Sequence, residues 1–415
     1  MTMTGLEADT ATAYRRFATN EARGNSPIYE AICQRIADDD AVLSLIATLP
    51  APKRQPNLVL GAARYLDAPS DDASSFAAWL HEHWDEVRAV ALSRATQTNE
   101  VGRCATLLPF IADAARAAGD GPISLVEVGC SAGLALYPDL YAYEYVAESE
   151  AGEDPAAGGA DDEGVDAYGE CKDAPAGGAM ASRGRESSCD DEVFEPREAS
   201  GPFGVDGVDG VDGVDRPLLT CVVAGALEEM TNATPPAPTI AWRGGLDLNP
   251  LDVLSDDPEA LDNARWLRAL VWPGQDERAS RLAAAIDTVR RHVTSHPEDA
   301  AHIVRGDVVD DLERLVAQVP DELHLVLFHS AVLAYVDDDT RTRFERRLHE
   351  LTHRPGGFTW ISNEAPSVMP GTRDAVAAAW EPRDLRGRFV LAVDGQPRAL
   401  TGPHGQSLTP WDATN

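Results

Sequence analysis

The stretch that decides the fold reads Ile123-Ser124-Leu125-Val126-Glu127-Val128-Gly129-Cys130-Ser131-Ala132-Gly133. Its first half is a short apolar run rich in β-branched residues, which is typical of a buried strand. The second half is a glycine-rich turn, where the backbone is free to approach a ligand closely. An apolar segment from Leu134 to Tyr145 follows, and we expect it to form a helix after an early Pro138. The start of such a helix would supply unpaired N–H donors at the turn.

Strands and helices alternate through the second half of the chain. This alternation predicts an α/β fold with a mostly parallel sheet and helices on both of its faces. The last two strands, Phe389 to Val393 and Arg398 to Leu400, are joined by Asp394-Gly395, a hairpin signal that predicts an antiparallel last strand. The other strands are expected at Thr239 to Leu248, His302 to Arg305, Leu323 to His329 and Phe358 to Ser362, and the helices at Pro258 to Ala269, Glu277 to Ser295, Val309 to Ala317 and Thr340 to Thr352.

Composition and periodicity divide the chain into three parts. Residues 1–120 carry apolar residues at three- and four-residue spacing and are predicted to form a helical N-terminal subdomain. Residues 121–146 together with 217–415 are predicted to form the α/β domain. Residues 147–216 are dense in Asp, Glu, Gly, Ala and Ser and contain a Val-Asp-Gly repeat from 205 to 215. Such a segment buries too little apolar surface to offset its ordering entropy, so we expect a disordered acidic insertion.

The chain is strongly acidic, with a net charge of −34 over 415 residues and only two lysines, Lys53 and Lys172. Such a surface repels nucleic acid and anionic lipid, so neither nucleic acid nor a membrane is expected as a partner. It suits a high-salt cytoplasm, and we hypothesise halophilic adaptation. With no membrane-length apolar stretch and no secretory signal, a cytoplasmic location is expected. The six cysteines form no C-x-x-C pair, and no metal site is expected.

Acidic residues follow two of the later strands. Gly245-Leu246-Asp247-Leu248-Asn249-Pro250 puts Asp247 at the end of one strand, and Gly306-Asp307-Val308 comes just past the next. A carboxylate at the first position can accept hydrogen bonds from both hydroxyls of a ribose. At the second position it can accept one from an adenine amine, while the next backbone N–H reaches a ring nitrogen. These positions lie at the carboxyl ends of neighbouring strands, where doubly wound sheets bind ligands.

Leu125 to Leu134, Gly245 to Pro250 and Gly306-Asp307 together resemble the cofactor-binding motifs of class I S-adenosylmethionine-dependent methyltransferases. The resemblance implies a Rossmann-like methyltransferase sheet, S-adenosylmethionine as cofactor, and an unknown methyl acceptor, either a small molecule or a protein. It also implies the binding residues. Glu127, Gly129, Ser131 and Gly133 would line the methionine end, Asp247 would hold the ribose, and Asp307 and Val308 would contact the adenine.

One residue departs from this pattern, and three further segments extend the resemblance. Ser131 stands where these methyltransferases have a glycine, which tightens the loop. With Gln97 to Arg103, Phe328 to Ser330 and Asn363 to Pro366, the chain looks like a member of an uncharacterised family, a domain of unknown function, built on this core. Arg103 has two interpretations: it reaches the cofactor carboxylate, or it lies on a solvated helix face or pairs with Glu100.

His329 is the candidate catalytic residue. It follows an apolar strand, at the edge where acceptor-side residues lie in the methyltransferase architecture, and a histidine titrates near neutrality, which suits a general base. The alternative is a structural histidine bonded to a neighbouring loop.

Two other functions stay open. Gly129-Cys130-Ser131-Ala132-Gly133 also fits the G-x-S-x-G elbow of α/β-hydrolases, with Ser131 as nucleophile and a histidine such as His329 as its base. The chain preceding this turn is helical in pattern, whereas the elbow normally follows several strands. The other alternative is a non-catalytic, methyltransferase-like binding protein.

Overall fold

One large sheet organises this computed structural model, which describes residues 5–97, 99–148, 208–209, 215–379, 385 and 387–411. Within these residues the sheet has ten strands, in the order β2-β5-β12-β11-β10-β9-β8-β1-β6-β7. The strands are β1 (Ile123–Val128), β2 (Ala142–Ala147), β5 (Leu218–Val223), β6 (Ile240–Asp247), β7 (His302–Arg305), β8 (His324–Ser330), β9 (Phe358–Glu364), β10 (Phe389–Val393), β11 (Gln396–Thr401) and β12 (Ser407–Pro410).

Five parallel strands, β7-β6-β1-β8-β9, form the doubly wound half of this sheet. The chain passes from β1 outward to β6 and β7, and then returns to β8 and β9 on the other side of β1. The strand order therefore reverses between β1 and β8, which is the position where doubly wound sheets bind ligands. The prediction of a mixed α/β fold with a mostly parallel sheet is confirmed.

The C-terminal strands extend the sheet in an antiparallel manner. β10 pairs antiparallel with both β9 and β11, and β11 pairs antiparallel with β12. Asp394 and Gly395 both have positive φ, 51° and 76°, as a two-residue hairpin turn requires. The hairpin predicted from this dipeptide is confirmed.

The helix predicted from Leu134 to Tyr145 is wrong. Two short 3₁₀ turns, Leu134–Leu136 and Pro138–Leu140, lead instead into β2. β2 pairs in parallel with β5 along its whole length, from Ala142 opposite Leu218 to Ala147 opposite Val223. Its partner lies some seventy residues later in the chain, so local periodicity gives no sign of this pairing.

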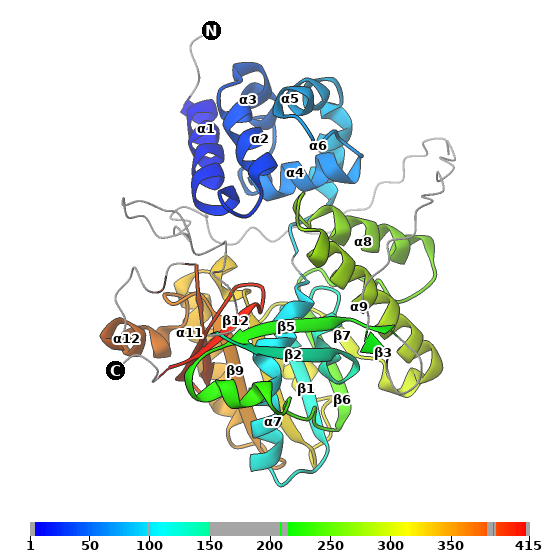
Figure 1. Cartoon of the computed structure of the whole chain (residues 1–415), viewed down its shortest axis with the longest axis vertical. Helices are drawn as coiled ribbons and strands as arrows, with labels where there is room; N and C mark the ends of the chain where they lie inside the picture. The colour runs from blue at the N-terminus through cyan, green and yellow to red at the C-terminus, as the bar shows by residue number, and fades with distance from the viewer. Residues whose placement is uncertain are drawn as a thin grey trace.

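The N-terminal helices form a bundle at one end of the molecule (Figure 1). The helix Cys104–Ala117 (α7) lies apart from this bundle and packs against β5, β8 and β9. Of the predicted helical subdomain, residues 1–120, the last helix thus packs against the sheet. The bundle comprises α1 (Gly5–Phe17), α2 (Pro27–Ala37), α3 (Asp40–Ile46), α4 (Pro56–Tyr65), α5 (Ala73–Glu82) and α6 (Trp84–Ser93).

Both faces of the doubly wound half are buried, as the alternation of side chains along a strand allows. Leu125 and Phe328 belong to the hydrophobic cluster that includes α7, whereas Val126 and Leu327 belong to the cluster on the opposite face. The first cluster continues into the N-terminal bundle without a break. The remaining helices are α8 (Pro258–Ala269), α9 (Asp276–Ser295), α10 (Leu312–Val316), α11 (Asp338–Leu351) and α12 (Pro370–Ala379).

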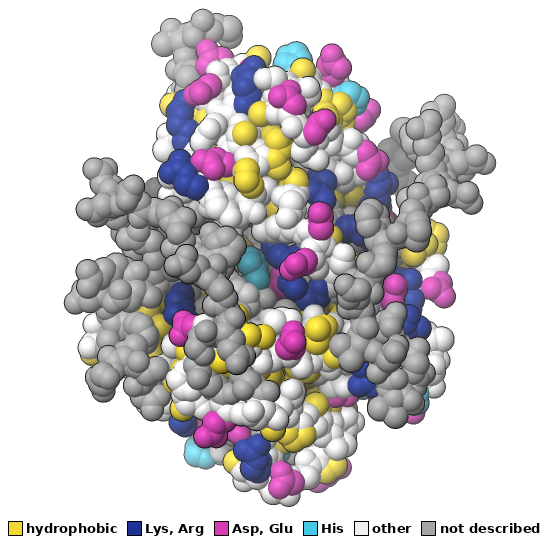
Figure 2. Space-filling model, in the orientation of Figure 1, with side chains coloured by type: hydrophobic (Ala, Val, Ile, Leu, Met, Phe, Trp, Pro, Cys, Tyr) yellow, Lys and Arg dark blue, Asp and Glu magenta, His cyan; other side chains and the backbone are white. Residues whose placement is uncertain are grey.

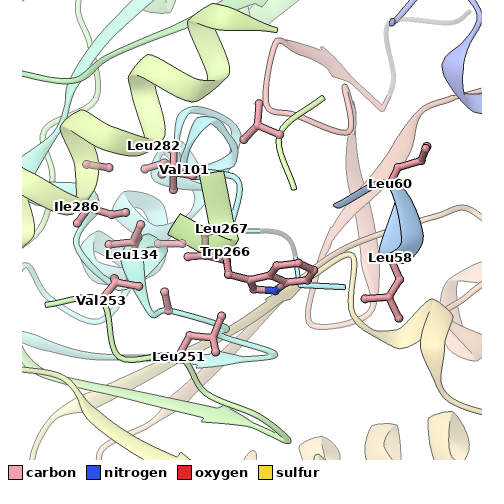
Figure 3. Close-up of a cluster of buried hydrophobic side chains, with 14 of the residues drawn as sticks. Leu58, Leu60, Val101, Leu134, Leu251, Val253, Trp266, Leu267, Leu282 and Ile286 are labelled. Atoms are coloured by element: carbon pink, nitrogen blue, oxygen red, sulfur yellow. The ribbon is translucent and has the colours of Figure 1, made fainter. Parts of the chain in front are cut away.

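Trp266 of α8 joins the bundle to the α/β part. It is fully buried and lies between the α4 leucines Leu58 and Leu60 and the cluster around Leu267 (Figure 3). Its indole N–H donates to the backbone oxygen of Ala95 at 3.1 Å.

The predicted disordered insertion, residues 147–216, lies mostly outside the described residues. At its edges the prediction differs from the structure, because Ala147 is the last residue of β2, and Val208–Asp209 (β3) pairs antiparallel with Asp215–Arg216 (β4). Among the described residues, no helix is long and apolar enough to cross a membrane. Four cysteines there, Cys33, Cys104, Cys130 and Cys221, are buried free thiols.

Candidate functional site

The loop after β1 turns sharply at the carboxyl edge of the sheet. Gly129, Ser131 and Gly133 all have positive φ, at 79°, 50° and 70°. This region favours glycine, so Ser131 holds a strained conformation there. The N–H groups of Gly129 and Cys130 both point to the backbone oxygen of Leu246, which fixes the loop to the end of β6.

Asp247 holds the same loop through its side chain. Its Oδ2 accepts from the Ser131 N–H at 2.9 Å, and its Oδ1 accepts from the Asn249 N–H at 2.7 Å and from Gln97 Nε2 at 3.5 Å. The structure thus brings Asp247 and the glycine-rich turn together, as their positions after neighbouring strands predicted. Each carboxylate oxygen has two lone pairs, so Oδ2 retains one for a ligand.

The loop after β7 joins this arrangement. The Gly306 N–H donates to the backbone oxygen of Asp247 at 2.9 Å. The Asp307 Oδ1 accepts from the N–H groups of Val309 and Asp310, so this carboxylate primarily holds its own turn. Val308 is buried. The three predicted loops therefore meet at one edge of the sheet, although the Asp307 side chain is partly committed to the turn.

Glu127 is a buried carboxyl group beside a narrow pocket at the point where the strand order reverses. It shares the α7 face of the sheet with Leu125, and its Oε2 has no hydrogen-bond partner among the described residues. Burial, together with the charge of Asp247, raises the pKa of Glu127 well above the ordinary value for glutamate. The pocket lining includes Asn99, Arg103, Glu127, Gly129, Phe328 and Ser330.

A second buried acceptor lies at the same pocket. Asn99 Nδ2 donates to the backbone oxygen of Cys130 at 3.2 Å, while its Oδ1 has no partner in the part of the chain that the structure describes. Glu127 Oε2 and Asn99 Oδ1, both without a partner among the described residues, thus belong to two residues that line one pocket. Buried polar atoms are normally paired, so this pair of exceptions indicates a ligand with N–H donors.

Arg103 lines the pocket as well, and it is buried rather than exposed on a solvated helix face. Its Nε donates to the Pro403 backbone oxygen at 2.8 Å, and one terminal nitrogen donates to the Ser330 backbone oxygen at 3.2 Å. These contacts hold the guanidinium beside Glu127, where its positive charge opposes the rise in the pKa of that carboxyl group. The guanidinium also lies near the Glu100 carboxylate, so of the interpretations of Arg103 only the solvated helix face is contradicted.

Sequence reasoning missed a cluster of charges next to Arg103. The buried carboxylate of Glu100 pairs with Arg278 Nε at 2.6 Å and with a terminal nitrogen of Arg281 at 3.1 Å. Burial alone would raise the pKa of Glu100, but these guanidinium groups lower this pKa to about 2. Arginines spaced along an amphipathic helix such as α9 look like a solvated face, so only the packing of α9 against residues 99–103 identifies them.

His329 does not fit the predicted role of general base. Its side chain is fully buried on the face opposite to the pocket, since it follows Phe328, which lines the pocket. Both ring nitrogens are occupied: Nδ1 lies 2.8 Å from Glu364 Oε1, and Nε2 accepts from the Trp360 indole N–H at 3.0 Å. This indole fixes the tautomer with the proton on Nδ1, so the geometry supports the structural alternative.

Replacing His329 by glutamine is therefore expected to lower the free energy of unfolding by about 1–3 kcal/mol, because Glu364 and Trp360 lose their partner. Affinity for a ligand in the pocket should not change. Denaturant unfolding measures the first quantity and ligand titration the second. His353→Gln, at an exposed position, is the matched control and should change neither. Unchanged stability of the His329 variant would contradict the structural role.

Two further details bear on the predicted loop residues. The Ser131 hydroxyl is buried and has no partner among the described residues, so the histidine that the hydrolase alternative requires is not beside it. At Gly129 an added Cβ would lie 2.4 Å from Val332 Cγ2, and at Gly133 it would lie 3.3 Å from Ile303 Cδ1. Gly129 is thus required by packing within the protein as well as by its backbone conformation.

Comparison with known proteins gives one family. The sequence pattern of a family of uncharacterised proteins conserved in bacteria, DUF2332, matches residues 11–176 and 212–410. No curated protein and no solved structure matches the chain, so nothing in the comparisons points to the methyltransferases. The match covers most of the sequence, as the resemblance to a domain of unknown function suggested. The chain therefore belongs to the DUF2332 family of uncharacterised proteins conserved in bacteria.

Proposed function

We propose that this protein binds S-adenosylmethionine at the carboxyl edge of β1, β6 and β7 and acts as a methyltransferase. The observation that carries the proposal is the buried Oε2 of Glu127, which has no partner among the described residues although Glu127 lines the pocket where the strand order reverses. Doubly wound sheets bind their ligands at this position. The resemblance of the three loops to methyltransferase motifs supplies the identity of the cofactor.

The chemistry of the donor set fits the amino-acid end of the cofactor. This end carries an α-ammonium group, which donates hydrogen bonds, and a carboxylate, which accepts them. Glu127 Oε2 and Asn99 Oδ1 are acceptors without partners, and Arg103 adds a positive charge to the wall of the same pocket. A site with both kinds of group discriminates a zwitterion from a simple cation or anion.

The nucleoside end of the cofactor would lie at Asp247 and Asp307. Asp247 retains one lone pair, on Oδ2, for a ribose hydroxyl, and Asp307 keeps its Oδ2 outside the hydrogen bonds that hold its turn. The exposed apolar side chain of Leu248 follows Asp247, and that of Ile303, on β7, lies beside Gly133 of the glycine-rich loop. Such side chains offer an adenine ring an apolar surface to pack against.

The sulfonium of the cofactor supplies an already activated methyl group. The task left to this chain is to hold the acceptor in line with that group and to exclude water. The side chains that meet at the pocket, Glu127, Asn99 and Arg103, would fix the orientation of the cofactor. His329 is turned to the other face, so we assign it no part in proton transfer.

Titration with S-adenosylmethionine and S-adenosylhomocysteine tests the proposal, and Glu127→Gln sharpens the test. The variant should bind both molecules about 10–100-fold more weakly, because a charge-assisted hydrogen bond to the ammonium is lost. Binding of the cation should also expel the proton that burial keeps on Glu127. Affinity of the unchanged protein should therefore rise with pH, from the ordinary range of glutamate up to the raised pKa of the free protein, and level off above it.

Glu127→Gln should show no such pH dependence. Calorimetry in buffers of different ionisation enthalpy measures the released proton directly, without any need for turnover. The control is Glu350→Gln, an exposed position on α11, which should behave as the unchanged protein. Absence of binding to both molecules would overturn the proposed function, and it would favour a non-catalytic protein with another ligand.

A further inference from the structure

The linker between the N-terminal bundle and α7 lies on the loop that carries Asp247. Gln97 Nε2 donates to the Asn249 backbone oxygen at 2.6 Å, and Asn249 Nδ2 donates to Gln97 Oε1 at 3.3 Å. Asn99, two residues later, donates to the Cys130 backbone oxygen at 3.2 Å. The linker thus contacts both the glycine-rich loop and the loop after β6, which the proposed function assigns to the cofactor.

The amide of Gln97 also occupies one oxygen of the Asp247 carboxylate. Its Nε2 lies 3.5 Å from Oδ1, which accepts from the Asn249 N–H at 2.7 Å as well. A carboxylate oxygen has two lone pairs, so both lone pairs of Oδ1 face donors of the protein itself. Oδ2 keeps one, since its only donor among the described residues is the Ser131 N–H. Asp247 therefore has room for one hydroxyl group, whereas a ribose presents two.

Two features make the contact between Gln97 and Asp247 replaceable. Its length of 3.5 Å is that of a weak hydrogen bond, and a hydroxyl group can bond to the same oxygen at a normal distance of about 2.7 Å. The Gln97 side chain is also partly exposed. Charged side chains of both signs gather where the bundle meets the sheet (Figure 2), so an amide released at this junction stays in polar surroundings.

We infer that Gln97 is an internal competitor of the ribose: its amide holds Oδ1 of Asp247 in the free protein and leaves when the second ribose hydroxyl binds. The inference rests on the proposed function, because it needs a nucleoside with both hydroxyls at Asp247. The affinity of this edge of the sheet for a nucleoside then depends on a residue of the linker, outside the predicted α/β domain.

Titration calorimetry of Gln97→Ala with S-adenosylmethionine tests the inference. Loss of the competitor should raise the affinity about three- to tenfold, which corresponds to one ordinary hydrogen bond. Loss of a residue that only supports the Asp247 loop would lower the affinity instead. Gln55→Ala is the matched control, because Gln55 contacts the same linker from the bundle by accepting from the Thr96 hydroxyl at 3.3 Å. It should leave the affinity unchanged.

Adenosine and 2′,3′-dideoxyadenosine show whether the effect acts through the ribose hydroxyls. The gain in Gln97→Ala should appear with adenosine and be absent with the dideoxy compound, which makes no use of Oδ1. If Gln97→Ala does not fold, Gln97→Met takes its place, since it keeps the length of the side chain without a donor and should gain affinity as well.

Equal or lower affinity of the folded variant for S-adenosylmethionine would overturn the inference and leave the proposed function standing. An equal gain with both nucleosides would also overturn the inference alone. If neither the unchanged protein nor the variant binds any of the three molecules, the proposed function is overturned and the inference with it.

Discussion

Replacing Asp247 by alanine is expected to weaken S-adenosylmethionine binding by about 30- to 1000-fold, which corresponds to about 2–4 kcal/mol. The variant loses the carboxylate proposed to hold the ribose. It also leaves the Ser131 and Asn249 N–H groups without an acceptor, so the glycine-rich loop loses its attachment to β6. We therefore expect the free energy of unfolding to fall by about 1–3 kcal/mol as well. Ligand titration and denaturant unfolding measure the two effects separately.

Asp247→Asn separates these contributions, because it keeps one oxygen for a backbone N–H and loses the charge. It should retain more stability than Asp247→Ala while still binding the cofactor weakly. Asp337→Ala is the matched control: this aspartate caps α11 by accepting from the Thr340 N–H at 2.8 Å, far from the loop in the chain. It should lose about 1 kcal/mol of stability and no affinity. Unchanged cofactor affinity in Asp247→Ala would contradict the assignment of the ribose site.

Replacing Trp266 by alanine is expected to lower the free energy of unfolding by about 3–5 kcal/mol. The indole is fully buried, donates to the Ala95 backbone oxygen, and lies edge-on to Tyr65 with ring centroids 6.0 Å apart. Its loss opens a cavity where the bundle packs on α8, so unfolding should also become less cooperative. Denaturant unfolding followed by far-ultraviolet circular dichroism and by fluorescence measures both changes.

Trp266→Phe retains most of the apolar volume and should cost less than the alanine variant. Trp79→Ala removes a half-buried tryptophan of α5 and serves as the control for loss of an indole within the bundle. Its cost should be smaller, and its unfolding should stay as cooperative as that of the unchanged protein. A cost below about 1 kcal/mol for Trp266→Ala would show that the bundle and the α/β part are held together by other contacts.

The sequence by itself determined the elements whose signals are local. The run from Ile123 to Val128, the helix from Pro258 to Ala269 and the Asp394-Gly395 hairpin lie where their periodicity and turn chemistry predicted. The meeting of Asp247 with the glycine-rich turn was also predictable, because parallel neighbours end at one edge of a sheet. The identity of any bound cofactor, the acceptor and the hypothesis of salt adaptation stay predictions.

Only the tertiary structure decided the features that depend on partners distant in the chain. β2 forms because it pairs with β5, some seventy residues later in the chain. The helix α7 packs on the sheet because it contacts β5, β8 and β9. His329 and Phe328 are neighbours in sequence, yet the period of two along a strand sends one to the pocket face and the other to the opposite face. Likewise Glu100 forms ion pairs with arginines of α9, about 180 residues later in the chain, because only the folded chain brings those charges within hydrogen-bond distance.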